Sequence, residues 1–78
     1  MTIPQLYDYF LQYPIITTDS RNVPKNALFF ALKGERFDGN VYAKGAVEKG
    51  AAYAIIDNPN CQEDERFLLV EDVLTSLQ

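Results

Sequence analysis

Two polar loops contain residue types that could bind an anionic ligand. The first loop, residues 18–21, reads Thr-Asp-Ser-Arg and follows the β-branched run of residues 15–18. In open α/β sheets, ligands bind outside the carboxyl ends of parallel strands, so this position suits a site. The Arg21 guanidinium offers a planar fork for phosphate or carboxylate, and the Ser20 hydroxyl is a short donor. The alternative is a plain turn, in which Asp19 and Ser20 bond the turn backbone and Arg21 is solvated.

The second loop, residues 33–40, reads Lys-Gly-Glu-Arg-Phe-Asp-Gly-Asn and leads into a predicted helix. Gly34 and Gly39 permit close backbone approach, two cations neutralise charge, and the Phe37 ring can stack on a base. A helix amino terminus also favours phosphate. The glycine spacing matches neither the phosphate loop of ATPases nor the dinucleotide-binding fingerprint. A charged loop with a helix cap is therefore the alternative here.

Composition excludes several other chemistries. The 78 residues contain no histidine and a single cysteine, Cys61, which rules out a zinc site, a disulfide framework and a Ser-His or Cys-His nucleophile within this chain. The net charge of −4 argues against a nucleic-acid partner. No apolar run approaches the length of a membrane span and no secretory leader opens the chain, so we expect no membrane association and a cytoplasmic location.

Hydrophobic patterning predicts a small layered α/β domain with a mixed, partly parallel sheet and flanking helices. Leu6, Tyr9 and Phe10 have helical spacing, and residues 27–32 form an apolar run typical of a strand buried on both faces. A strand, helix and strand over residues 27–56 predict a parallel βαβ unit. The expected helices span residues 3–11, 41–49 and 72–77, and the expected strands span residues 15–18, 27–32, 51–56 and 67–70.

Residues 15–57 together resemble the amino-terminal domain of the Mur ligases, the ATP-dependent amino-acid-adding enzymes of peptidoglycan precursor synthesis. The matching pattern is Asp-Ser-Arg, then Leu-Phe-Phe-Ala-Leu-Lys-Gly, then Asp-Gly-Asn, and a helix ending in Lys-Gly-Ala before an alanine-rich strand. Many relatives have histidine where this chain has Asn40. Asparagine keeps a donor, an acceptor and capping ability but carries no charge, so no titrating ring acts at this position.

The resemblance implies a role in holding the uridine-diphosphate end of UDP-N-acetylmuramoyl-peptide. By position, it assigns the following residues to substrate binding: Thr18, Ser20, Arg21, Gly34, Glu35, Arg36, Phe37 and Asn40. It places ATP, Mg²⁺ and the catalytic residues in other domains of a longer, monomeric ligase. There the peptide carboxylate is activated as an acyl phosphate and attacked by an amine. Residues 1–78 would be the substrate-binding domain of a truncated three-domain chain, inactive alone.

Two alternatives to this interpretation stay open. The string Gly-Glu-Arg-Phe-Asp-Gly resembles the branch of the family that adds D-alanyl-D-alanine, whereas the sister branch that adds the third peptide residue shares the surrounding framework. A different class of protein, a stand-alone binding module without catalysis, would have the same fold. The sequence does not decide which amino acid or dipeptide is added.

Overall fold

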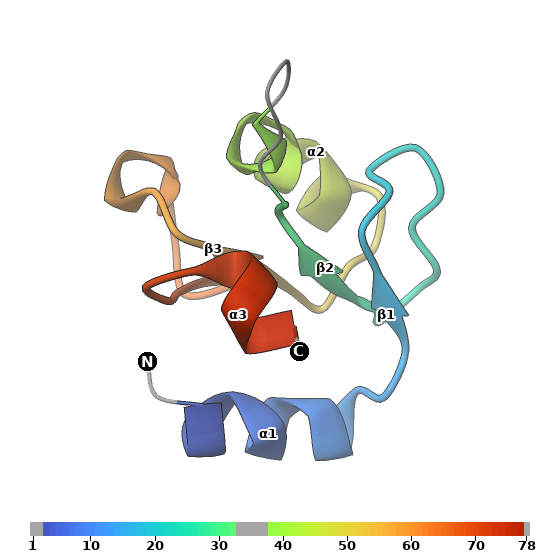
Figure 1. Ribbon diagram of the computed structural model, residues 1–78. Helices are drawn as coiled ribbons and strands as arrows, with labels where there is room; N and C mark the ends of the chain where they lie inside the picture. The colour runs from blue at the N-terminus through green and yellow to red at the C-terminus, as the bar shows by residue number, and fades with distance from the viewer. Residues whose placement is uncertain (1–2, 33–37, 78) are drawn as a thin grey trace.

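The computed structural model describes residues 3–32 and 38–77 of the chain, which form a sheet with helices on both faces (Figure 1). The elements in chain order are helix α1 (Ile3–Gln12), strand β1 (Ile16–Thr17), strand β2 (Leu28–Phe30), 3-10 helix η1 (Gly39–Tyr42), helix α2 (Ala43–Glu48), strand β3 (Tyr53–Ile56), 3-10 helix η2 (Pro59–Cys61), strand β4 (Phe67–Leu69) and helix α3 (Val73–Leu77).

The four strands lie side by side in the order in which they occur along the chain, β1-β2-β3-β4. All three pairings are parallel, with Ile16 opposite Leu28 and Phe29 opposite Ala54 in the register. The α/β class and the predicted βαβ unit are therefore confirmed. The sheet is parallel throughout rather than mixed, because every connection returns the chain to the amino-terminal edge before the next strand begins.

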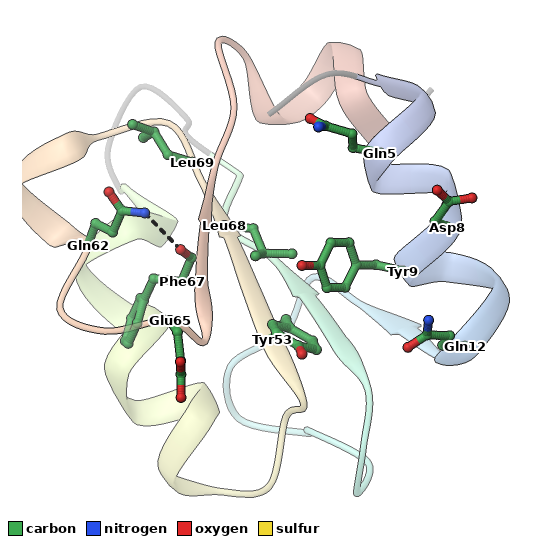
Figure 2. Close-up of a pocket in the computed structure, with 10 residues that line it drawn as sticks. All are labelled: Gln5, Asp8, Tyr9, Gln12, Tyr53, Gln62, Glu65, Phe67, Leu68 and Leu69. Carbon is green, nitrogen blue, oxygen red and sulfur yellow. Dashed lines mark hydrogen bonds between the residues drawn. The ribbon is translucent and has the colours of Figure 1, made fainter.

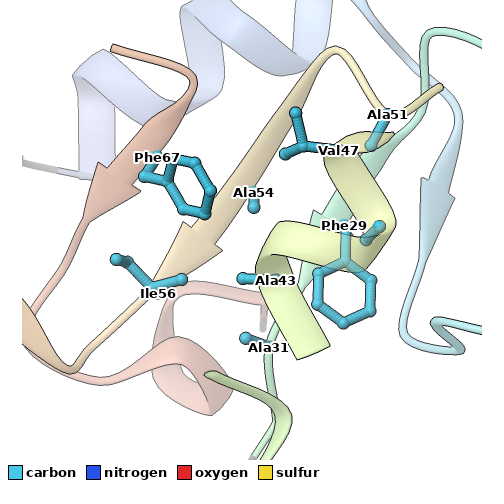
Figure 3. Close-up of a cluster of buried hydrophobic side chains, with 9 residues drawn as sticks. Phe29, Ala31, Ala43, Val47, Ala51, Ala54, Ile56 and Phe67 are labelled. Carbon is cyan, nitrogen blue, oxygen red and sulfur yellow. The ribbon is translucent and has the colours of Figure 1, made fainter. Parts of the chain in front are cut away.

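Successive side chains of each central strand enter opposite hydrophobic layers. In β2, Phe29 packs beneath α2, whereas Leu28 and Phe30 pack on the other face. The same alternation holds in β3, where Ala54 faces α2 and Ile55 faces away from it. Figure 3 shows the α2 layer around Phe29. A strand buried on both faces requires a continuous apolar sequence, which explains the apolar run of residues 27–32.

Helices cover both faces of this sheet. Figure 1 shows α2 on one side and α1 with α3 on the other. Leu6 of α1 and Val73 of α3 are buried in one layer, and Ala46 and Val47 of α2 are buried in the other. Within the described residues, no helix has both the length and the apolar character that crossing a membrane requires.

The predicted helix of residues 41–49 starts differently from the expectation. A 3-10 turn, η1, precedes α2, and the Asp38 side chain caps it by accepting a hydrogen bond from the backbone N–H of Asn40. Val41 and Tyr42 are therefore exposed rather than part of a regular helix face. Gly50 follows α2 with a φ of +124°, a conformation that favours glycine.

Candidate functional site

A pocket of about 490 Å³ lies at the carboxyl ends of β1 and β2. Both predicted loops contribute to it. Its walls are Thr18, Asp19, Ser20, Arg21, Phe29, Leu32, Gly39 and Tyr42. Because β1 and β2 are parallel neighbours, the segments that follow them emerge at the same edge of the sheet. This is the edge at which α/β proteins bind their ligands.

The first wall of the pocket is a turn that is held together by its own side chains. Thr17 Oγ1 accepts a hydrogen bond from the Asp19 N–H at 3.1 Å and donates one to the Asn22 carbonyl at 3.1 Å. Asp19 Oδ1 accepts from the backbone N–H of Arg21 at 2.9 Å and from its Nε at 3.1 Å. The turn-backbone interpretation is thus confirmed for Asp19.

The charges in this wall are paired but remain accessible. Two hydrogen bonds from Arg21 hold the pKa of Asp19 below its usual 3.8. The bond from the side chain has the larger effect, and the bond from the backbone N–H has the next largest. The same carboxylate raises the pKa of the Arg21 guanidinium. The Arg21 side chain is 88% exposed, so its outer nitrogens can reach an anionic ligand.

The Thr18 and Ser20 hydroxyls differ from these paired groups. Neither forms a hydrogen bond to any other residue that the structure describes, and both residues line the pocket. Each hydroxyl can therefore donate to a ligand without breaking a hydrogen bond to any residue within 3–32 or 38–77. The role of Ser20 as a donor to a ligand stays a prediction.

The second wall depends on a close backbone approach at Gly39. Its N–H donates to the Leu32 carbonyl at 2.7 Å, which brings together the two ends of the intervening segment. A Cβ on Gly39 would lie 2.5 Å from that carbonyl oxygen, so glycine is required here. The predicted contacts at Gly34, Glu35, Arg36 and Phe37 lie outside the described residues.

Asn40 lies apart from the pocket and is fully occupied inside the protein. The residue is only 2% exposed. Its Nδ2 donates to Asp38 Oδ1 at 2.7 Å and to Asp57 Oδ1 at 2.9 Å. Its Oδ1 accepts from the backbone N–H groups of Asp57 at 3.0 Å and Asn58 at 3.2 Å. The geometry thus gives the amide a structural role, and no part of it is left for a ligand.

Asp57 extends this contact to a third element. Its Oδ2 accepts a hydrogen bond from the backbone N–H of Val73 at 3.2 Å, at the start of α3. The 3-10 helix η1, the residue that follows β3 and the start of α3 therefore meet at one carboxylate. Sequence reasoning assigned no role to Asp57, because its partners are 16 and 17 residues away.

Two further residues near the pocket were not singled out as site residues from the sequence. Tyr42 lines the pocket although it belongs to η1. Lys49, just after α2, donates from Nζ to the Ser20 carbonyl at 2.7 Å. The Lys-Gly-Ala string marked Lys49 only as a helix end, and no local pattern could show which loop it reaches.

A larger hollow, of about 760 Å³, lies between α1 and the β4 side of the sheet (Figure 2). Its lining residues are Gln5, Asp8, Tyr9, Gln12, Tyr53, Gln62, Glu65, Phe67, Leu68 and Leu69. These ten include two carboxylates and neither lysine nor arginine, which disfavours an anionic ligand. Burial raises the pKa of Tyr53, so its phenol is neutral at pH 7. The smaller pocket, which includes Arg21, is the better candidate for a phosphorylated ligand.

Comparison with known proteins decides the family. The model of the Mur ligase family, catalytic domain, matches residues 12–76. The chain belongs to the Mur ligase family. Among curated relatives, the UDP-N-acetylmuramoyl-tripeptide–D-alanyl-D-alanine ligase of Bacillus subtilis is 43% identical over 65 residues, which cover 81% of this chain and 14% of the relative.

Both branches of the family occur among the relatives of this chain. The UDP-N-acetylmuramoyl-L-alanyl-D-glutamate–2,6-diaminopimelate ligase of Rickettsia typhi is 36% identical over 74 residues, covering 92% of this chain and 15% of the relative. The crystal structure of the MurF ligase from Thermotoga maritima in complex with ADP superposes with a TM-score of 0.73 at 30% identity, over 81% of this chain and 14% of that one. A MurF from Acinetobacter baumannii gives a TM-score of 0.69 at 36% identity, over 83% of this chain and 14% of that one. The chain therefore spans about one seventh of the length of these relatives.

Proposed function

We propose that this chain is the amino-terminal, substrate-binding domain of a Mur ligase and that it anchors the uridine-diphosphate end of a UDP-N-acetylmuramoyl-peptide. The observation that carries the proposal is the pocket shared by residues 18–21 and the Gly39 wall. It combines an exposed guanidinium, an apolar floor that includes Phe29 and the hydroxyls of Thr18 and Ser20, which form no hydrogen bond to the other described residues. These groups suit a ligand with a charged diphosphate and a flat base.

Within this site, Ser20 donates a hydrogen bond to the diphosphate, and Arg21 or Arg36 neutralises its charge. Phe37 flanks the uracil, and Thr18, Gly34 and Glu35 complete the predicted contact set. Asn40 is better regarded as a support for the second loop, because its amide is satisfied by Asp38, Asp57 and Asn58.

The parent enzyme is proposed to be an ATP-dependent amide-bond ligase that adds D-alanyl-D-alanine to the UDP-N-acetylmuramoyl-tripeptide. The Bacillus subtilis relative and the MurF structures favour this branch. The residues present do not fit ATP or Mg²⁺: the chain has no phosphate loop, and the described part contains no group of three or more acidic, cysteine or histidine side chains that could hold a metal ion. We assign those ligands to other domains of a cytoplasmic, monomeric parent.

Titration of UDP into the ¹⁵N-labelled chain, followed by amide shifts, tests the site. A charge-assisted hydrogen bond contributes about 1.5–3 kcal/mol, so Ser20→Ala and Arg36→Ala should each weaken binding by about one to two orders of magnitude. Glu63→Ala is the control, because this exposed residue does not line the pocket. If both loop variants keep the wild-type affinity, the proposed site is wrong.

The branch is tested with the full-length parent. We expect turnover with the UDP-tripeptide and D-alanyl-D-alanine, and none with the UDP-dipeptide and a diamino acid. Turnover only with the second pair would assign the chain to the diaminopimelate-adding branch, which the Rickettsia typhi relative represents. A parent gene without a Gly-x-x-Gly-Lys-Thr/Ser loop in the following few dozen codons would contradict the ligase altogether.

A further inference from the structure

Lys49 connects helix α2 to the loop that lines the proposed site. Its Nζ donates a hydrogen bond of 2.7 Å to the carbonyl oxygen of Ser20, which lies 29 residues earlier in the chain. Figure 1 shows the loop after β1 running beside α2, in agreement with this contact. The bond joins a charged donor to a neutral carbonyl, a combination stronger than a neutral pair.

Other hydrogen bonds among the described residues of the loop fix its internal shape. They join Thr17, Asp19, Arg21 and Asn22 to one another, and all span five residues or fewer. Three of them tie the turn to Thr17, which lies in β1 and pairs with Phe29 in the sheet. None of these bonds involves Ser20, so they restrain its position relative to the opposite wall of the pocket only indirectly.

Lys49 adds a second anchor, which joins Ser20 directly to the end of helix α2. Helix α2, which it directly follows, is fixed against the sheet by the buried side chains of Ala43, Ala46 and Val47. The backbone N–H of Lys49 continues this helix by donating to the carbonyls of Gly45 and Ala46. The Lys49 side chain thus starts at the end of a packed helix and reaches a residue that lines the pocket.

We propose that Lys49 is a positioning residue that sets the place of Ser20 and, through it, the affinity of the site for a nucleoside diphosphate. The inference rests on the proposed function, because it takes the diphosphate as the ligand. Lys49 acts on the protein backbone and not on the ligand. Its removal is therefore expected to weaken binding without unfolding the domain, since the side chain is exposed.

The test compares UDP affinity in four forms of the chain: wild type, Lys49→Met, Lys49→Arg and Lys44→Met. Methionine keeps the apolar stem and removes the donor, so we expect the dissociation constant for UDP to rise by about three- to tenfold. Arginine should restore most of the affinity. Lys44 is the matched control, because it lies in α2, the helix that Lys49 directly follows, and its side chain is 65% exposed and near Glu63. An unchanged affinity in Lys49→Met, with no change in melting temperature in any variant, would refute the proposal.

A double-mutant cycle with Ser20→Ala distinguishes positioning from direct contact. If Lys49 acts through Ser20, the Lys49→Met change should cost much less in the Ser20→Ala background than in the wild type. Additive effects would show that Lys49 acts on the ligand independently, which would overturn its assignment as a positioning residue.

A readout without ligand separates this inference from the proposed function. The ¹H–¹⁵N heteronuclear NOE of residues 18–21 should fall in Lys49→Met and stay unchanged in Lys44→Met. If the wild type fails to bind UDP but the NOE falls in Lys49→Met, the proposed function is wrong, whereas the positioning role of Lys49 is supported. If UDP binds and the NOE of Lys49→Met equals that of the wild type, the positioning role of Lys49 is wrong, whereas the proposed function is supported.

Discussion

Replacing Asn40 by alanine removes the polar contact that joins the second loop to the end of β3. The side chain forms four hydrogen bonds, two to the carboxylates of Asp38 and Asp57 and two from backbone N–H groups. A neutral hydrogen bond contributes about 1 kcal/mol net and one to a charged group about 1.5–3 kcal/mol. After truncation, water can reach the partly exposed hydrogen-bond partners of Asn40. We therefore expect the free energy of unfolding to fall by about 2–4 kcal/mol.

That loss is large for a chain of this size. A stability of about 0.05–0.15 kcal/mol per residue gives roughly 4–12 kcal/mol for 78 residues. Urea unfolding followed by circular dichroism should therefore show a clearly lower midpoint for Asn40→Ala, with the slope unchanged. Asn60→Ala is the matched control, because Asn60 is exposed and its truncation should change stability by less than about 0.5 kcal/mol.

The Asn40→Asp variant tests the donor role of the amide separately from its acceptor role. Aspartate can still accept from the two backbone N–H groups, but its carboxylate would face those of Asp38 and Asp57. The repulsion raises the pKa of this group, so the penalty is present above that pKa and is relieved as the pH falls through it. If Asn40→Ala costs no more than Asn60→Ala, or if Asn40→Asp is as stable as the wild type at pH 7, the structural role given to this amide is wrong.

Three other predictions concern the loops and α2. Gly39→Ala should lower the free energy of unfolding by about 1–3 kcal/mol, because the new Cβ would lie 2.5 Å from the Leu32 carbonyl oxygen. Gly45→Ala should raise it by about 0.5–1 kcal/mol, since this glycine lies in a helix and nothing lies within 4 Å of its Cβ position. In urea unfolding the two midpoints should shift in opposite directions, and shifts of the same sign would contradict one of the two predictions. Asp19 should titrate below 3.8 by carboxyl ¹³C NMR, so the order that its pairing gives the loop is present above pH 3.8 and is lost as the pH falls through the lower folded-state pKa. Arg21→Gln should raise that pKa, and an unchanged titration would refute the pairing.

Local patterns were sufficient to predict the elements that position the site. The spacing of Leu6, Tyr9 and Phe10 predicted α1, and these residues do pack on the sheet. The apolar run of residues 27–32 predicted a strand buried on both faces, and β2 has this environment. Such patterns succeed because a strand or helix face leaves a periodic signature within a few residues.

The contacts between distant segments could not be predicted in this way. The sequence indicated that Asn40 could cap a helix or bind a ligand, but not that Asp57 would occupy its amide from 17 residues away. The direction of the outer strands was also uncertain, since β1 has two residues and β4 has three. Strand direction and long-range polar contacts depend on how the layers pack, and a local pattern does not record that.

The strand order has a consequence for how the molecule assembles during synthesis. Because each strand neighbours its predecessor, no strand has to insert between two that have already paired. The growing chain can therefore add β2 to β1, then β3 and β4, in the direction in which the ribosome releases them. The walls of the pocket all lie within the first 42 residues, so the ligand-binding edge is the first part of the sheet to emerge.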